Sequence, residues 1–355
     1  MQAANSIFAD SGAILWKIEM LNFEYRRNIM LNPLIVNAAK VLDGAELSRA
    51  EALELARSIE GADILDLASL ANKVREKFSP EIIPCSILNA KSGVCPQNCR
   101  FCAQSAHHHT GIETYPLLPK EKVIEAAKRA AAHGANSFGY VTSGYGYRSV
   151  TPEFERILET LDAVHEACPE LKLCVSIGIL SRETARLLAE HHTWRYNMNL
   201  QTNPARYAEL IADTHTIEEK IQTIRYLQEF GVTICCGGIF GLGETWEDRV
   251  DMAIAVRELK VKGAPLNVLL PIAGTPLEGR PVMKPAEVSK CFSIFRLINP
   301  AMELKFAAGR ETVMKDFQGL LMLSGLNGMI TGGYLTTRGR SPEDDLKFID
   351  ALGIF

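Results

Sequence analysis

The sequence has no marked excess of charge of either sign. Its 38 lysine and arginine residues stand against 42 aspartate and glutamate residues, a formal net charge of −4, and it has no basic tail. Proteins that cover nucleic acid or an acidic membrane surface concentrate lysine and arginine on one face. The balance of charge therefore predicts no nucleic-acid partner.

Long apolar runs are also missing. No segment reaches the roughly 18 apolar residues that a membrane span needs, and the first residues lack the basic, apolar and small-residue order of a secretory signal. There is no internal repeat and no low-complexity segment. These absences predict a cytoplasmic protein that does not bind a membrane.

The number of cysteines, by contrast, indicates how they are used. The nine cysteines are an odd count, and a cytoplasmic compartment keeps thiols reduced. Cysteines there are more often metal ligands, nucleophiles or small buried residues than disulfide partners. The sequence therefore excludes a disulfide scaffold and leaves the use of each thiol to be assigned.

The length of 355 residues fits either two mid-sized domains or one large barrel, since α/β barrels run to roughly 250 residues and more. We predict a flexible or partly helical arm over residues 1–43, in which Met20 or Met30 is an alternative start. A helical lead-in over 44–78 follows, because Ser48 and Glu51 have capping-box spacing and apolar residues then recur every three and four positions. Residues 44–355 would form one barrel together with this lead-in.

After the lead-in, short apolar runs alternate with longer amphipathic ones. The predicted strands are 82–88, 137–142, 173–177, 196–200, 232–237, 266–270, 304–307 and 328–330. The predicted helices are 120–132, 152–167, 182–191, 217–230, 246–260, 285–298 and 311–323. Eight strands separated by helices predict an α/β fold, a (β/α)8 barrel of the TIM type. A doubly wound open sheet is the alternative, although no GxGxxG follows the first strand.

Three thiols lie within eight residues directly after the first predicted strand, at Cys95, Cys99 and Cys102. In a barrel this loop is at the carboxyl-end mouth, where catalytic groups gather. Three thiolates on one loop can hold a cubane iron–sulfur cluster and leave one iron without a protein ligand. A structural zinc site is the alternative, because the adjacent His107, His108 and His109 offer a fourth ligand.

The CxxxCxxC spacing, with Phe101 before the last cysteine, resembles the signature of radical S-adenosylmethionine (SAM) enzymes. The resemblance implies a [4Fe-4S] cluster on Cys95, Cys99 and Cys102, with SAM bound to the fourth iron through its amino and carboxylate groups. Reductive cleavage of SAM would then yield a 5′-deoxyadenosyl radical. Phe101 would lie near the adenine.

Further segments narrow the resemblance to the biotin synthase family, over roughly residues 44–353. They are Ser86–Gly93, Ala103–Ala106, Tyr196–Leu200, Cys235–Thr245, Asn267 with Gly274–Leu277, Gly309–Glu311 and Tyr334–Thr337. The family is a transferase of biotin biosynthesis that inserts sulfur into dethiobiotin and uses a second iron–sulfur cluster as sulfur donor. The resemblance also implies a homodimer and a reducing protein such as flavodoxin or ferredoxin.

For the second cluster the resemblance implies Cys174 and Cys235, both in predicted strands. The better-known form of the family has a two-iron cluster held by three cysteines and an arginine, but here Gly139 stands at the first cysteine position and Lys305 at the arginine. Lysine does not replace a planar guanidinium. The sequence is therefore closer to the variant that lacks the usual two-iron ligand set, and Cys236 is a candidate additional ligand at a bulge or strand end.

The remaining implied roles concern SAM and the substrate. Asn199 would contact both, Asn197 and Asn267 would bind the ureido ring, and Lys305 would lie at the substrate. Gln201 stands where the family has a carboxylate for the ribose hydroxyls, and so lacks the charge-assisted part of that hydrogen bond. The other implied SAM contacts are Thr142, Ser143, Gly238 and Ile239.

Cys168 and Cys291 are predicted to be packing residues. Cys85, in the first strand, is also predicted to be a small packing residue, with a position facing the barrel lumen as the alternative. Arg310 is predicted either to bind a substrate carboxylate or to pair with Glu244. Two further hypotheses stay open at this point. One is a related radical SAM enzyme acting on another molecule, such as a tetrapyrrole side chain, which the departures at Gly139 and Lys305 favour. The other is a non-catalytic protein that binds zinc or an iron–sulfur cluster.

Overall fold

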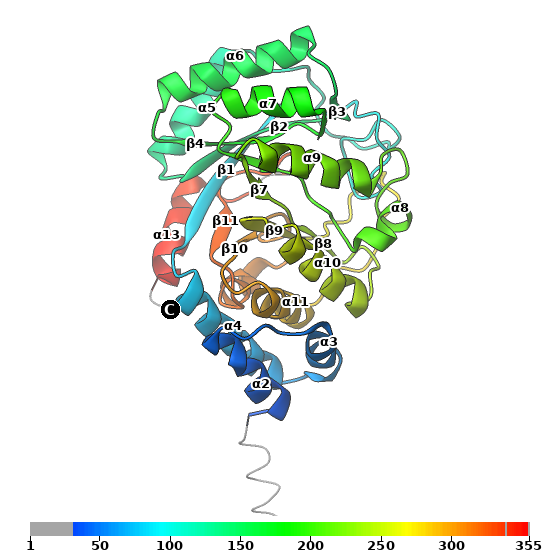
Figure 1. Ribbon diagram of the computed structural model, residues 1–355, viewed down its shortest axis with the longest axis vertical. Coiled ribbons are helices and arrows are strands. Elements are labelled where there is room, and N and C mark those ends of the chain that lie inside the picture. Colours follow the sequence, from blue (N-terminus) through cyan, green and yellow to red (C-terminus); the bar gives the residue numbers. More distant parts are fainter. Residues whose placement is uncertain (1–30, 338, 354–355) are drawn as a thin grey trace, which may run out of the picture.

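Parallel strands form a closed barrel in the computed structural model, which describes residues 31–337 and 339–353. Each strand pairs with its neighbours in order, and β10 pairs with both β9 and β11, so the ring has no free edge. Closure rules out the open doubly wound sheet and confirms the predicted barrel (Figure 1). The barrel strands are β1 (Ile83–Lys91), β2 (Ser137–Thr142), β4 (Lys172–Ser176), β6 (Arg195–Asn197), β7 (Thr233–Cys235), β8 (Gly238–Phe240), β9 (Gly263–Val268), β10 (Glu303–Phe306) and β11 (Gly328–Ile330).

The predicted strand at 232–237 is divided. Cys236 and Gly237 separate β7 from β8, and both pieces pair with β9. A Cβ on Gly237 would lie 2.0 Å from the Pro265 carbonyl oxygen, so only glycine allows this close approach of the two strands. Outside the barrel, β3 (Gly146–Tyr147) and β5 (Ile179–Leu180) form a small parallel pair that was not predicted.

Helices surround the barrel close to the predicted positions (Figure 1). The main ones are α5 (Lys120–Ala132), α6 (Pro152–Ala167), α7 (Arg182–Glu190), α9 (Ile217–Glu229), α10 (Trp246–Glu258) and α11 (Pro285–Ile298). Shorter pieces are η2 (Pro204–Arg206), α8 (Tyr207–Leu210), η3 (Lys315–Phe317) and α12 (Gln318–Met322). Their apolar faces form one core with the outer face of the strands. Among the described residues, no helix is long and apolar enough to cross a membrane.

The lead-in forms a helical layer beside α10 and α11. It consists of α2 (Pro33–Ala38), η1 (Ala39–Asp43), α3 (Arg49–Ser58) and α4 (Asp63–Phe78). The predicted capping box at the start of α3 is present, since Ser48 accepts from the Glu51 backbone and Glu51 accepts from Ser48. Ile35, Ala38 and Val41 are buried, so the end of the predicted arm belongs to this layer. The alternative starts Met20 and Met30 lie outside the described residues.

The C-terminal region differs from the prediction. In place of one helix over 311–323 there are turns followed by η3 and α12, because Arg310 and Glu311 at its start make side-chain contacts with other segments. An unpredicted helix, α13 (Pro342–Leu352), ends the described chain. Its start had a readable signal, with Ser341 as N-cap, Pro342 in the first turn and acidic residues after it.

Candidate functional site

The three clustered thiols lie on the loop that leaves the carboxyl end of β1. Gly93 and Val94, with φ of 76° and 50°, turn the chain there in the left-handed region. The backbone nitrogen of Cys95 donates to Gln104 O (3.0 Å), and that of Ala106 donates to Cys95 O (2.8 Å). The loop is therefore held by its own main chain before any metal binds.

Burial keeps two of these thiols neutral. It raises the pKa of Cys99 to about 11 and the pKa of Cys102 to about 12. The buried ammonium of Lys220 counteracts the shift at Cys99, and its Nζ donates to Asn199 O at 3.0 Å. Buried thiols ionise when a metal supplies the opposite charge. This donor set suits metal binding better than nucleophilic catalysis.

The zinc alternative finds little support in the geometry. Within the described chain, no three His, Cys, Asp or Glu side chains converge closely enough to hold one metal ion. A multi-iron cluster binds each thiolate to a different iron, so its ligands lie further apart. The Nε2 atoms of His107 and His108 lie 3.1 Å from Pro96 O and 3.0 Å from Cys99 O, engaged with the main chain of the loop.

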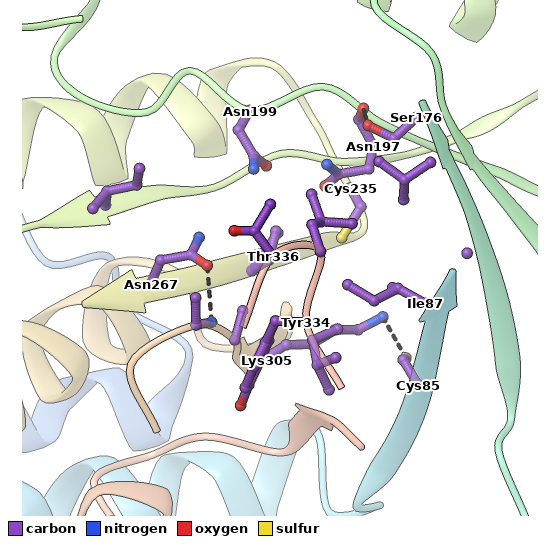
Figure 2. A pocket seen from close by; sticks show the side chains of 18 of the residues that line it. Cys85, Ile87, Ser176, Asn197, Asn199, Cys235, Asn267, Lys305, Tyr334 and Thr336 are labelled. Atoms are coloured by element: carbon purple, nitrogen blue, oxygen red, sulfur yellow. Dashed lines mark hydrogen bonds between the residues drawn. The ribbon is translucent and has the colours of Figure 1, made fainter. Parts of the chain in front are cut away.

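A cavity of about 310 Å³ fills the barrel interior beneath this loop. A volume of this size is within the range of small-molecule sites, and the walls are mainly apolar. Figure 2 shows the view into it, with side chains from strands on opposite sides pointing inward. Ten of the residues singled out from the sequence line it: Phe101, Cys102, Cys174, Asn197, Asn199, Gln201, Cys235, Ile239, Asn267 and Lys305.

The side-chain amides in the cavity differ in which of their atoms lack a hydrogen-bond partner. Asn197 Oδ1 and Gln201 Oε1 are buried without a hydrogen-bond partner, and an unpaired buried polar atom is costly. Asn199 Oδ1 accepts from Gly237 N at 3.0 Å. Asn267 donates to Gly238 O and accepts from Ala308 N, both at 3.0 Å. Asn197 and Gln201 are therefore the amides that fit a polar ligand directly.

Several predicted residues lie outside the cavity lining. Ser143 donates to Gly93 O (2.7 Å) and so supports the cysteine loop, and Thr142 is buried just before it. At Gly238 a Cβ would lie 2.2 Å from Met252 Sδ, so glycine is needed there for packing. Cys95 and Cys99 lie on the loop above the cavity and do not line it.

The floor of the cavity carries a charged network beside the strand cysteines. Glu303 accepts from Arg195 Nη1 (2.8 Å) and lies 2.6 Å from Lys305 Nζ. Lys305 Nζ in turn donates to Cys85 Sγ at 2.8 Å (Figure 2). Glycines make room for the cations, since a Cβ on Gly263 would lie 3.3 Å from Arg195 Nη1 and one on Gly328 would lie 2.7 Å from Lys305 Cγ.

The network is ionised. Burial acts to lower the pKa of Lys305, yet the negative charge that Cys85 and Cys235 carry when deprotonated, together with the Glu303 carboxylate, raises it above its ordinary value. Burial acts to raise the pKa of Glu303, but Lys305 and Arg195 lower it. Burial raises the pKa of Cys174 to about 12 and also raises that of Cys235. The floor thus holds neutral thiols beside fixed charges.

Sequence reasoning missed part of this floor. Arg195 and Glu303 were not candidates, and Cys85 was assigned to packing. A signal was available in the sequence. Glu303 and Lys305 are two residues apart in β10 and therefore lie on the same face of the strand, and charged residues within a barrel strand are unusual. Cys236 is the opposite case. It is fully buried in the core and does not line the cavity, because it directly follows Cys235, the last residue of β7, and successive residues of an extended chain point to opposite sides.

Arg310 does not pair with Glu244. Its side chain is fully buried and lies 2.8 Å from Asp345 Oδ1, whereas Glu244 accepts from Arg249 Nε at 2.8 Å. Arg310 also stays out of the cavity lining. Its role is to hold α13 against the barrel, which corrects both sequence-based alternatives.

A buried histidine near the cysteine loop predicts a pH effect on stability. Burial, with the charge of Lys220, lowers the pKa of His215 from 6.5 to about 4, and its Nε2 lies 2.7 Å from the Tyr207 hydroxyl. Between these values the unfolded chain binds a proton that the folded chain does not, so stability falls as pH drops through this window. The loss from this group is up to about 3 kcal/mol.

Urea unfolding of wild-type protein and His215→Gln, at several pH values from about 7 to 4, measures this contribution. We expect a shallower pH dependence in His215→Gln, because glutamine does not titrate. His109→Gln, at an exposed position, should keep the wild-type slope. Equal slopes in all three proteins would contradict the assignment.

Comparison with known proteins adds to this geometry. Residues 90–255 match the Radical SAM superfamily, and residues 265–355 match the Biotin and Thiamin Synthesis associated domain. In three dimensions the chain is similar to methylornithine synthase, with a TM-score of 0.77, 19% identity and coverage of 89% of this chain and 96% of that one. It is also similar to the FeFe-hydrogenase maturase of Carboxydothermus hydrogenoformans, with a TM-score of 0.74, 18% identity and coverage of 96% and 82%. At these identities the likeness concerns the fold alone.

Curated relatives are much nearer in sequence. Biotin synthase of Chlorobium phaeovibrioides is 55% identical over 326 residues, covering 92% of this chain and 98% of the relative. Biotin synthase of Chlorobium luteolum is 52% identical over 326 residues with the same coverage. Sequence identity at this level, over nearly the full length of both proteins, agrees with the cysteine loop and the barrel cavity, and the chain belongs to the biotin synthase family.

Proposed function

We propose that the protein converts dethiobiotin to biotin by inserting one sulfur atom between two unactivated carbons. The observation that carries the proposal is that two sets of thiols line a single cavity. Cys102 and Phe101 line it at the loop end, and Cys174 and Cys235 line it at the floor. A substrate between them would face one group on each side.

The chain's own residues fit these groups. Cys95, Cys99 and Cys102 would hold a [4Fe-4S] cluster with SAM, and Cys174 and Cys235 would hold a second iron–sulfur cluster. When bound, the first cluster and SAM supply a carbon-centred radical able to abstract hydrogen from an unactivated carbon, and the second cluster supplies sulfur. The cofactors thus carry the difficult chemistry, and the protein provides position and exclusion of water.

Binding of the substrate would use the unpaired amides. An amide oxygen such as Asn197 Oδ1 can accept a hydrogen bond from a ureido N–H, and Gln201 Oε1 can accept one from a ribose hydroxyl of SAM. Asn199 and Asn267 hold the backbone of β8 and its surroundings in place through their own hydrogen bonds. Their role in this proposal is to orient the walls of the site.

The C-terminal segment would exclude water from the mouth. Residues 334–337 line the cavity, and the Tyr334 hydroxyl donates to Glu311 Oε2 at 2.6 Å. Leu335 O accepts from Asn89 Nδ2 at 3.1 Å, which ties the segment to β1. Closure of the mouth matters because a carbon radical reacts with any accessible C–H or S–H bond near it, so other molecules must be kept out of the site.

The family resemblance also supports three finer proposals. The electron comes from a small reducing protein such as flavodoxin or ferredoxin, the chain works as a homodimer, and it is located in the cytoplasm.

Anaerobic turnover tests the proposed function. The protein is reconstituted with iron and sulfide and supplied with SAM, a reductant and dethiobiotin. We expect biotin, with two molecules of 5′-deoxyadenosine per biotin because two C–H bonds are broken, and neither product without SAM. Cleavage of SAM with no biotin would show that the substrate is another molecule. Absence of both products from protein with its full iron content would refute radical chemistry.

A further inference from the structure

Cys85 lies on the cavity floor, which is the alternative to the preferred prediction of packing. It is on β1, is 4% exposed, and lines the same cavity as Cys174 and Cys235. Figure 2 shows its side chain directed toward Lys305 across the floor. A third thiol is therefore present on the side of the barrel where the family's usual first cysteine is missing.

The usual position cannot hold a thiol in this chain. Gly139 pairs with Ile87 on one side and with Cys174 on the other. A Cβ on Gly139 would lie 2.9 Å from Ile87 Cγ2, so the side chain of Ile87 already occupies that space. Cys85 precedes Ile87 by two residues on the same face of β1. The thiol has thus moved to the neighbouring strand, next to the residue that fills the gap.

The surroundings of the Cys85 sulfur are unusual for packing. Lys305 Nζ donates to it at 2.8 Å and Ser137 Oγ donates at 3.1 Å. A neutral thiol is a weak acceptor and requires no cation. Two donors aimed at one buried sulfur suit a sulfur that carries negative charge.

The charge on the floor agrees with an anionic ligand set. Lys305 and Arg195 are two buried cations that share one carboxylate, Glu303. With neutral thiols the floor carries an uncompensated positive charge, which is costly in a buried site. Thiolates bound to iron would supply the missing negative charge.

We propose that Cys85 is the third thiolate ligand of the second iron–sulfur cluster, together with Cys174 and Cys235. This inference rests on the proposed function. On binding, the Cys85 thiol releases its proton to solvent and its sulfur forms a bond to iron, with no change in oxidation state. Lys305 remains an ammonium, has no lone pair to bind iron, and donates its hydrogen bond to the Cys85 sulfur.

Mössbauer spectroscopy and iron analysis of anaerobically reconstituted Cys85→Ala protein test the ligand. The matched control is Cys291→Ala, a buried cysteine on α11 outside the cavity lining, and Cys235→Ala marks the signal of the second cluster. We expect Cys85→Ala and Cys235→Ala to lose the same iron species, while Cys291→Ala keeps it. The SAM cluster in each sample, measured as cleavage of SAM, shows that the variant has folded.

The outcomes separate this inference from the function on which it rests. If Cys85→Ala keeps the second iron species with wild-type parameters while Cys235→Ala loses it, Cys85 is not a ligand and the proposed function stands. If wild-type protein itself contains no second iron species, both the ligand assignment and the proposed function are wrong. If Cys85→Ala also loses SAM cleavage while Cys291→Ala keeps it, Cys85 has a wider structural role and the ligand assignment is overturned.

Discussion

Replacing Cys99 with alanine is expected to abolish cleavage of SAM. The three loop thiols are the only protein ligands that we assign to the first cluster, so the loss of one exposes the iron to dissociation. Changes in groups that merely support metal ligands already cost about 10–100-fold in affinity or activity. Removal of a ligand should therefore lower the rate by roughly 10³-fold or more. The measurements are bound iron and 5′-deoxyadenosine under anaerobic conditions.

His107→Ala is the control that separates an iron–sulfur site from zinc. His107 is exposed, and the hydrogen-bond partner of its Nε2 is a main-chain oxygen of the loop, Pro96 O. A zinc site with His107 as its fourth ligand would lose metal in this variant. We expect His107→Ala to keep its iron and its SAM cleavage. Full SAM cleavage by Cys99→Ala would refute the assignment of the cluster ligands.

Replacing Asp345 with alanine is expected to destabilise the protein by about 3 kcal/mol, because the buried guanidinium of Arg310 then keeps only one of its two carboxylate partners, Glu311. Asp345 and Arg310 are both fully buried, 2.8 Å apart. Asp345 Oδ2 also accepts from Gly332 N at 3.0 Å, next to the segment that covers the cavity. The variant should therefore also lose biotin formation more than it loses SAM binding. Urea unfolding and turnover measure the two effects.

Two further variants set the scale for this loss. Asp345→Asn keeps an acceptor for Gly332 N and should be less harmful than alanine. Glu190→Ala breaks an exposed ion pair with Arg186, whose side chains are 51% and 44% exposed. Such pairs contribute less than about 1 kcal/mol, so this variant should unfold almost as the wild type does. Equal stability of Asp345→Ala and Glu190→Ala would refute the structural role of the buried pair.

The barrel and the cysteine loop could be predicted because their signals are local. Apolar runs and helical periods identify the elements residue by residue, and three thiols in eight residues are close in space however the chain folds. The errors have non-local causes. The region 311–323 has a helical pattern. However, Arg310 donates to Asp345 and Glu311 accepts from Tyr334, and both partners are far along the chain. Such long-range contacts leave no mark in the periodicity.

The cysteines in and beside the strands show how far ligands can be predicted from positions that match those of the family. Cys174 and Cys235 were predicted to point inward, and both line the cavity. Cys236 was predicted from its neighbour, but strand geometry turns it into the core. Cys85 was assigned to packing because a lone thiol in a strand has no local feature that marks it as a ligand.

The sequence by itself determined the fold class, the family and the thiol triplet on the loop after the first strand. These depend on spacing along the chain, which is readable without coordinates. Only the tertiary structure decided what faces the cavity floor. Closing the barrel brings Cys85, Arg195 and Lys305 together from β1, β6 and β10, residues up to 220 positions apart. A charge or a thiol acquires its chemistry from neighbours within a few ångströms, and the fold alone chooses those neighbours.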